Sequence, residues 1–358
     1  MQLIVPMAGK STRFPDVKPK WMLTHPSGRF MAIEAIRGLN LDAFERINFV
    51  YLQEHQDKHK FLKGFHEELE DLGLLGKSNL IPLREPTADQ PETVLQALKI
   101  AAIKGPILIK DSDNYFEATV SPVNYVCSCD LNSLGLVKAR NKSYISLNGL
   151  GKVANIVEKQ VISSTFCVGG YGFRDASVFE SALDRLGPMK ERYISNVIYD
   201  LLLQGEDFES VPVKKYSDWG TIEDWDRYKR TFGTLFIDLD GTLVKNSSAH
   251  FPPYIGESEP LRTNVDTVIE LQRSGKFQII ITTSRPEKYR AVTEQQLATI
   301  GIQYTALIMG LHHSKRIIIN DYSKSNPFKS CDSINLKRDG EDLKEILRES
   351  LGIDYDEI

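Results

Sequence analysis

Two stretches of this chain place residues that can handle phosphate directly after an apolar run. The first run, LIVPMA at positions 3–8, leads into Gly9, Lys10, Ser11, Thr12 and Arg13. Small residues allow backbone N–H groups to approach an anion, and a basic side chain can close over it. The composition of this loop favours a nucleoside triphosphate as its ligand, although a strand followed by a Gly-Ser turn is often only a turn.

Carboxylates and a lysine further along the chain suit the same ligand. The segment PILIKDSDNYF ends an apolar run with Asp111 and Asp113, KKYSDWGTIEDW supplies Asp218, and KPKWML supplies Lys20. A divalent cation held by a triphosphate and one or two carboxylates needs oxygens from separate loops at one edge of a sheet. The sequence therefore predicts a metal–triphosphate site, in which Asp111 is either a ligand or the cap of the following turn.

The second stretch, GTLFIDLDGTLV at 233–244, presents two aspartates at the end of another apolar run. Asp238 and Asp240 should project together at the carboxyl end of a strand, before Gly241 turns the chain away. Such a pair suits a nucleophile and a proton-transferring acid around one Mg²⁺. The alternative is a calcium loop or a capped turn, but calcium loops do not follow an apolar strand in this way.

Three later residues are expected to complete the second site. FQIIITTSR ends a strand at Thr283, a neutral phosphate donor, and Lys315 precedes a third expected strand, RIIIND at 316–321, which delivers Asp321. Lys315 lies close before Asp321 in the sequence, so Lys288 or Arg285 is an alternative source of the positive charge.

The elements that must position these residues form two α/β domains. The chain has 358 residues, which exceeds a single compact core. Short apolar runs alternate with amphipathic helical stretches twice, which indicates two βαβ units. The runs are LIVPMA, INFVYL and PILIKD in the first half, and LFIDLD, FQIIITT and RIIIND in the second. We place the boundary near residue 231, with domains at 1–230 and 231–358. A terminal helix with Leu343, Ile346, Leu347 and Leu351 on one face closes the second domain.

Composition limits the classes of partner. A net charge of −4 provides no basic surface for a nucleic-acid backbone, so small molecules are favoured. We expect no membrane partner and a cytoplasmic location, because no apolar run approaches the length of about 18 residues that spans a bilayer. The four cysteines are expected to be ordinary thiols rather than a disulfide framework.

An ordered set of motifs in residues 1–230 resembles the sugar-phosphate nucleotidyltransferase family: MAGKSTRF, the Pro-Lys ending at Lys20, DSDN, VEKQ followed by GGYGF, and SDWGT. The resemblance implies a Rossmann-like mixed sheet with a nucleotide loop at residues 9–13, where Gly9 and Arg13 contact the triphosphate. It further implies that Lys20 holds phosphate oxygens, that Asp113 and Asp218 bind Mg²⁺, and that the sugar phosphate lies at Glu158, Lys159 and Gly170. One departure is Ser11, which stands where the family usually has a second glycine.

The reaction that this resemblance implies is in-line attack by a phosphate oxygen of the acceptor on the α-phosphorus of the nucleotide. Pyrophosphate leaves. Because the acceptor is already an anion, no general base is required, and positioning with charge neutralisation carries the rate. This agrees with the absence of histidine from the motif set.

The order DLDGT, TTSR, Lys and ND in residues 231–358 resembles the haloacid dehalogenase superfamily, whose second aspartate favours its phosphatases. The resemblance implies a parallel sheet. Members of the superfamily commonly insert a cap, but the stretches from Thr242 to Thr283 and from Arg285 to Lys315 are too short to hold one. Asp238 would form an aspartyl-phosphate, and Asp240 would protonate the leaving oxygen and later activate water. Thr283 and Lys315 would hold phosphoryl oxygens, while Asp321 would bind Mg²⁺ together with Asp238 and Asp240.

The sequence thus predicts a bifunctional enzyme. Its first half would transfer a nucleotidyl group from a nucleoside triphosphate, with CTP favoured, to a phosphorylated sugar or polyol of surface-polysaccharide synthesis. Its second half would hydrolyse a different phosphomonoester, beneath a lid borrowed from the first domain or from a second subunit of a homo-oligomer. One alternative is a transferase whose second domain is a scaffold. The other is a nucleotide-sensing regulator, which would not need the carboxylates of Asp113, Asp218, Asp238, Asp240 and Asp321.

Overall fold

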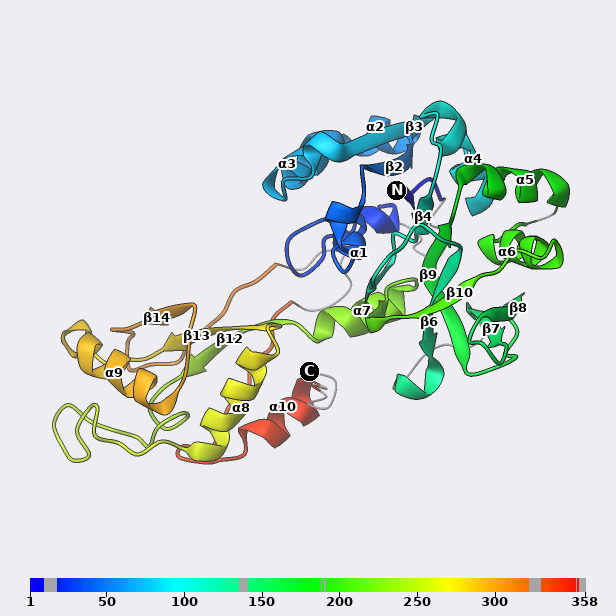
Figure 1. Cartoon of the computed structure of the whole chain (residues 1–358). Helices are drawn as coiled ribbons and strands as arrows, with labels where there is room; N and C mark the ends of the chain where they lie inside the picture. The colour runs from blue at the N-terminus through cyan, green and yellow to red at the C-terminus, as the bar shows by residue number, and fades with distance from the viewer. Residues whose placement is uncertain are drawn as a thin grey trace. The chain divides into compact units, whose positions relative to one another are not determined.

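A computed structural model describes residues 1–9, 18–134, 141–187, 189, 191–321, 330–351 and 353. The chain divides into two compact units, Met1–Trp225 and Asp226–Ile358 (Figure 1). The division falls inside helix α7 (Ile222–Arg230), slightly before the boundary that the sequence predicts. Lys10, Ser11, Thr12 and Arg13 lie outside the described residues.

The first unit contains a nine-stranded mixed sheet. Its main path runs β10-β6-β9-β4-β1-β2-β3, and β7 pairs with both β8 and β9. A separate two-stranded ribbon joins β11 to β5. The strands are β1 (Gln2–Pro6), β2 (Arg46–Leu52), β3 (Ser78–Leu83), β4 (Ile107–Lys110), β5 (Asn114–Glu117), β6 (Tyr125–Asp130), β7 (Ser143–Leu147), β8 (Val153–Glu158), β9 (Thr165–Phe173), β10 (Glu209–Pro212) and β11 (Lys214–Asp218).

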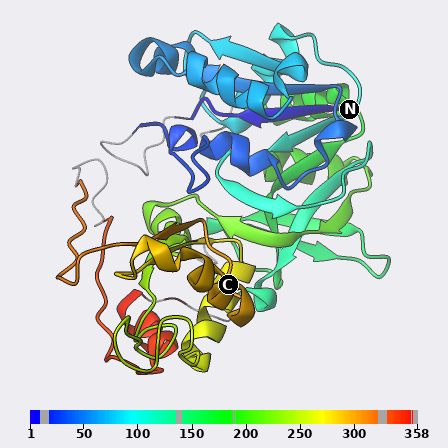
Figure 2. The same cartoon turned by 90° about the vertical axis from the view of Figure 1, so that its left-hand side faces the viewer.

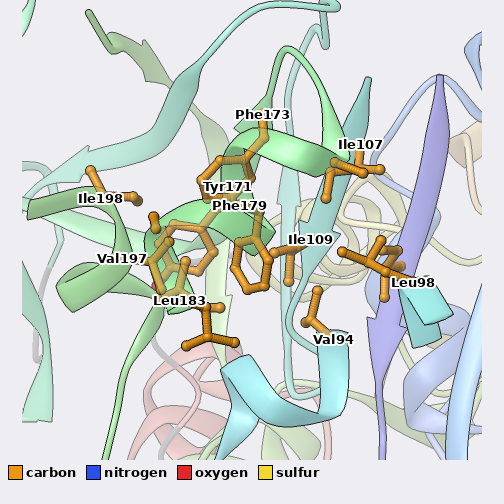
Figure 3. Close-up of a cluster of buried hydrophobic side chains, with 14 of the residues drawn as sticks. Val94, Leu98, Ile107, Ile109, Tyr171, Phe173, Phe179, Leu183, Val197 and Ile198 are labelled. Carbon is orange, nitrogen blue, oxygen red and sulfur yellow. The ribbon is translucent and has the colours of Figure 1, made fainter. Parts of the chain in front are cut away.

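Helices cover both faces of this sheet (Figures 1 and 2). In β1, Ile4 packs into one apolar cluster while Leu3 and Val5 pack into the other, as the two-residue period of a strand requires. Helices α4, α5 and α6 line the first cluster, part of which Figure 3 shows, and α1 and α3 line the second. The helices are α1 (Met31–Ile36), α2 (Gln53–His59), α3 (Leu62–Asp71), α4 (Gln90–Ile100), α5 (Ala176–Leu186) and α6 (Ile194–Leu203), with a short 3-10 turn η1 (Lys20–Met22).

β1 lies parallel to both β2 and β4, whereas β9 runs antiparallel to β4 and β6. The parallel part confirms the βαβ pattern of the first half, because the three apolar runs expected there form β1, β2 and β4. The carboxyl ends of β1 and β4 therefore meet at one edge of the sheet, which is where ligands of open α/β sheets bind.

The second unit contains a smaller parallel sheet in the order β12-β13-β14. Helix α10 packs on α8, and its Leu343 and Leu347 are buried, which confirms the expected terminal helix. The elements are β12 (Gly233–Asp238), α8 (Arg262–Arg273), β13 (Phe277–Thr282), α9 (Arg290–Ile300), β14 (Ala306–Ile308) and α10 (Leu343–Leu351).

One expected strand of the second unit is wrong. RIIIND at 316–321 forms no strand, and Ile317, Ile318 and Ile319 are exposed. The third place in the sheet belongs to β14, whose three residues were too short a run to single out. An apolar run becomes a strand only when a neighbouring strand pairs its backbone groups, and the sequence pattern does not show which run finds that neighbour.

Among the described residues, none of the helices has both the length and the apolar character needed to cross a bilayer.

Candidate functional site

The edge formed by β1 and β4 carries the first group of predicted residues. Gly9 lies just after β1, and Asp111 and Asp113 lie in the turn after β4. The Ser112 hydroxyl donates a hydrogen bond to the carbonyl oxygen of Pro6 (3.4 Å), which ties the second turn to the end of β1. The nucleotide loop predicted at Gly9 and the carboxylates of the β4 turn therefore start from the same edge.

A buried lysine shapes the β4 turn. Lys110 is fully buried, and its Nζ donates to the carbonyl oxygens of Asp111 (2.8 Å) and Asn114 (3.0 Å) and to Oδ1 of Asn114 (2.5 Å). Burial lowers the pKa of Lys110 to about 8, so the side chain remains protonated near neutral pH. The turn is thus folded around an ammonium group, with Asp113 on it. From the sequence, this lysine was expected to be part of an apolar strand.

Asp113 and Asp218 come together although more than a hundred residues separate them. Asp218 is the cross-strand partner of Asn114 in the β5–β11 ribbon, and the Trp219 N–H donates to the Asp113 carbonyl oxygen (2.9 Å). A Cβ built on Gly220 would lie 3.1 Å from Oδ1 of Asp218 and 3.6 Å from Oδ2 of Asp113. Both carboxylates therefore face the same small space beside Gly220.

Each of these carboxylates pairs with a lysine. Lys20, from η1, donates to Oδ2 of Asp113, and Lys142 donates to Oδ2 of Asp218. Burial by itself would raise the pKa of Asp113, but the adjacent Lys20 outweighs it and holds that pKa below its usual value. Asp113 is therefore an anion near neutral pH. Lys142 could not be predicted from the sequence because it belongs to no motif.

Asp111 has different surroundings. Its Oδ1 accepts a hydrogen bond from the Gln90 side chain (2.6 Å), and its N–H donates to the carbonyl oxygen of Gly169 (2.8 Å). Burial raises the pKa of Asp111, and the neighbouring Asp113 raises it further. Asp111 thus favours its neutral form more than Asp113 does, which makes Asp113 the better ligand for a cation.

The predicted sugar-phosphate residues lie at the carboxyl end of β8 and in β9. Glu158 accepts hydrogen bonds from the hydroxyls of Ser143 and Ser195, the latter at 2.8 Å. Lys159 has a left-handed backbone (φ 56°), and its Nζ donates to the Tyr193 hydroxyl (2.5 Å). That hydrogen bond is the main reason why the pKa of Lys159 is raised.

Gly170 lies inside β9, where close packing accounts for the absence of a side chain. A Cβ there would approach the Phe116 ring to 2.7 Å and Sγ of Cys127 to 2.8 Å. Its neighbour Gly169 has φ +80°, and a Cβ there would lie 2.3 Å from Oδ2 of Asp111. The two glycines let β9 pass close to the β4 turn. A contact between Gly170 and a sugar phosphate stays a prediction.

The described residues contain no group of three His, Cys, Asp or Glu side chains arranged to hold a metal ion. The Asp113–Asp218 pair nevertheless offers two hard oxygen ligands from separate loops. This donor set fits Mg²⁺, which is usually bound through one or two carboxylates together with phosphate oxygens.

In the second unit, the structure places Asp238 and Asp240 at the carboxyl end of β12. Asp238 forms an ion pair with Arg316 (3.0 Å), and burial raises its pKa. Oδ1 and Oδ2 of Asp240 each accept one hydrogen bond of 2.8 Å from Arg285. The hydroxyl of Thr283 also donates to Asp240 (3.2 Å), so the first three residues predicted for this site do lie together.

Arg285 anchors this group from within the core. Its side chain is only 2 % exposed, and it also donates to Thr293 (3.2 Å) and Gln296 (2.8 Å) of α9. A second hydroxyl, that of Ser247, donates to Asp240 (2.6 Å). Arg285 therefore neutralises Asp240, whereas the sequence analysis considered it as a phosphate-binding cation.

Two predicted residues are not brought to this group. Lys315 and Asp321 are both exposed, at the two ends of the segment that forms no strand. Asp321 forms no metal-binding group of three with Asp238 and Asp240, as far as the described residues show. The physical reason is the missing strand, which would have carried Asp321 to the edge of the sheet.

Comparisons with known proteins find structural similarity alone. No family model and no curated protein sequence matches the chain. Solved structures match its N-terminal part, covering 62–63 % of it. A nucleoside-diphosphate-sugar pyrophosphorylase from Vibrio cholerae RC9 is 20 % identical, with a TM-score of 0.52 and 98 % of its own chain covered.

Two further structures match the same part. A putative glucose-1-phosphate thymidylyltransferase from Bacillus anthracis is 18 % identical (TM-score 0.52, 93 % of its chain covered). An inositol-1-phosphate CTP transferase from T. maritima is 13 % identical (TM-score 0.51, 90 % covered). The first unit thus has the mixed α/β fold of sugar nucleotidyltransferases.

Proposed function

We propose that the first unit is a nucleotidyltransferase that joins a nucleotide to a phosphorylated sugar or polyol and releases pyrophosphate. One observation carries the proposal: Asp113 and Asp218 converge from separate elements, each paired with a lysine, at the sheet edge where β1 and β4 end. Alternating charges in one place suit a bound triphosphate and its counter-cation. The fold shared with sugar nucleotidyltransferases supports the same conclusion.

In the proposed reaction, a phosphate oxygen of the acceptor attacks the α-phosphorus, and the bond to the β-phosphate oxygen breaks. Lys20 binds phosphate oxygens of the nucleotide, and Glu158 accepts a hydrogen bond from a hydroxyl of the acceptor. Asp113 and Asp218 would hold Mg²⁺, which when bound neutralises the negative charge that gathers on the phosphates. No side chain needs to remove a proton, because the attacking oxygen is already anionic.

CTP and a small phosphorylated polyol or sugar are the substrates that we propose, in the cytoplasm where nucleoside triphosphates are available. One support is that a neighbour of similar fold is named an inositol-1-phosphate CTP transferase. The test is a screen of pyrophosphate release by the full chain, with four nucleoside triphosphates against a panel of sugar and polyol phosphates. Release that needs both substrates supports the proposal, and silence across the panel refutes it.

We further propose that the second unit hydrolyses a phosphomonoester. Support comes from Asp238 and Asp240 at the carboxyl end of β12, with the Thr283 hydroxyl beside them. Asp238 would attack phosphorus and form an aspartyl-phosphate, and Asp240 would give a proton to the leaving oxygen. Because both carboxylate oxygens of Asp240 accept hydrogen bonds from Arg285, this proton transfer requires that ion pair to open when substrate binds.

Experiments can distinguish the proposed functions from two alternatives. In one, the second unit is a scaffold for an oligomer, and in the other the chain is a nucleotide-sensing regulator. Release of inorganic phosphate from p-nitrophenyl phosphate that disappears in Asp238→Asn would support hydrolysis. Equal release by both proteins would exclude Asp238 as the nucleophile, and no release by the wild type would favour the scaffold.

A further inference from the structure

Lys142 is a cation that the motifs do not include, yet it lies between two parts of the candidate site. Its side chain is 12 % exposed, and its Nζ contacts Oδ2 of Asp218 and the Tyr216 hydroxyl (2.7 Å). The Lys142 Nζ also lies 5.3 Å from the centre of the Tyr216 ring. A buried ammonium group requires such partners, because an uncompensated charge away from water is costly.

The backbone of Lys142 is joined to the predicted sugar-phosphate residues. Its carbonyl oxygen accepts a hydrogen bond from the Lys159 N–H (3.0 Å), directly beside the Ser143–Glu158 pair of the β7–β8 ladder. Two lysines therefore start from the same end of one hairpin. The Nζ of Lys159 reaches Tyr193, whereas that of Lys142 reaches Asp218.

We propose that Lys142 is a second cation for the phosphate of the acceptor, acting together with Lys159. This inference rests on the proposed nucleotidyltransferase function and adds a residue to it. The acceptor phosphate has to lie between the sugar-binding side, at Glu158 and Lys159, and the nucleotide side, at Asp113 and Asp218. Lys142 is the described lysine that contacts both sides, through its backbone to Lys159 and through its ammonium group to Asp218.

At this position, the ammonium group of Lys142 can exchange Asp218 for the acceptor phosphate as its anionic partner. When Asp218 engages a cation beside the nucleotide, the ammonium group of Lys142 needs another anion within reach. A phosphomonoester dianion provides that anion and several oxygens that accept hydrogen bonds. A purely structural role, in which Lys142 only holds Asp218, would instead change how the chain handles the nucleotide and its metal.

The test uses the full chain with Lys142→Met, which keeps the length of the side chain, and Lys142→Arg, which keeps its charge. Lys152→Met is the matched control, because the side chain of Lys152 pairs with Asp207 (2.6 Å) at an exposed position. Circular dichroism checks that each variant is folded, and Lys142→Gln replaces Lys142→Met if the latter is not. Glucose 1-phosphate and inositol 1-phosphate are the probes.

Loss of a charge-assisted hydrogen bond to phosphate should raise the KM for the sugar phosphate about ten- to a hundredfold in Lys142→Met. The KM for the nucleotide should change less than about twofold, Lys142→Arg should recover most of the loss, and Lys152→Met should match the wild type. An unchanged KM for the sugar phosphate, or equal increases in both KM values, would overturn the inference.

Calorimetry without nucleotide separates this inference from the function on which it rests. The wild-type chain should bind one of the two probes, and Lys142→Met should bind it at least about tenfold more weakly. Equal binding by both proteins, or no binding by the wild type, would refute the role of Lys142. Binding that depends on Lys142 without any release of pyrophosphate would refute only the proposed function.

Discussion

Replacing Arg285 by methionine should destabilise the second unit selectively. Arg285 makes two hydrogen bonds of 2.8 Å to Asp240 and two more to α9. Each charge-assisted bond contributes about 1.5–3 kcal/mol, and removing one member of a buried ion pair costs about 3–5 kcal/mol. We expect the free energy of unfolding of the second unit to fall by about 3 kcal/mol, the lower end of the range for a buried ion pair. The loss is limited because Ser247 and Thr283 still donate hydrogen bonds to Asp240.

Hydrogen exchange measured by mass spectrometry resolves this effect within the full chain. A loss of 3 kcal/mol corresponds to about 150-fold faster exchange of the most protected amides of β12 and β13, with peptides of the first unit unchanged. The control is Arg290→Met, whose ion pairs with Glu287 and Glu294 are exposed, so the amides of the second unit should exchange in this variant as in the wild type.

A double-mutant cycle tests the reasoning itself. Asp240→Asn alone leaves Arg285 buried without its anion, whereas the double variant leaves neither charge unpaired. The double variant should therefore be about 2 kcal/mol more stable than the sum of the single effects predicts. Additive effects, or an Arg285→Met chain that exchanges like the wild type, would show that this ion pair does not hold the site together.

Three further predictions follow from the two sites. Asp238→Asn should lower phosphate release by several orders of magnitude and leave pyrophosphate release nearly unchanged, and a folded variant that lost both activities would contradict separate sites. Asp113→Ala should slow pyrophosphate release by about 10²–10³-fold and Asp111→Ala by much less, and equal losses would reassign the metal ligand. His25 is 6 % exposed, and burial lowers its pKa to about 4. Because the unfolded chain then binds the additional proton, the first unit should lose about 2 kcal/mol of stability as the pH falls from 6.5 to 4. Tryptophan fluorescence reports this unit alone, since all three tryptophans lie in it, and His25→Asn should remove that part of the pH dependence.

The sequence predicted the parallel half of the first sheet because strand periodicity and loop chemistry agree there. LIVPMA, INFVYL and PILIKD became β1, β2 and β4, and the carboxylates of two distant motifs met at Gly220. The ordered motifs predicted these positions because each motif places a particular loop directly after a strand.

Residues outside motifs could not be predicted in this way. Lys142 and Gln90 reach the site through tertiary packing, and Lys110 belonged to an expected apolar strand, with no signal that its side chain organises the following turn. The strand predicted at RIIIND was wrong for a different reason. Its apolar run looks like a strand in the sequence, but within the part of the chain that the structure describes no neighbouring strand pairs with it. Asp321 was misplaced together with it.

The pair formed by Asp113 and Asp218 is the feature on which the proposed nucleotidyl transfer depends. The most direct test is the rate of pyrophosphate release by the full chain, with CTP, Mg²⁺ and the most active acceptor of the screen, for the wild type and Asp218→Asn. We predict release that requires all three components and falls about 10²–10³-fold in Asp218→Asn. A variant as fast as the wild type would contradict the account.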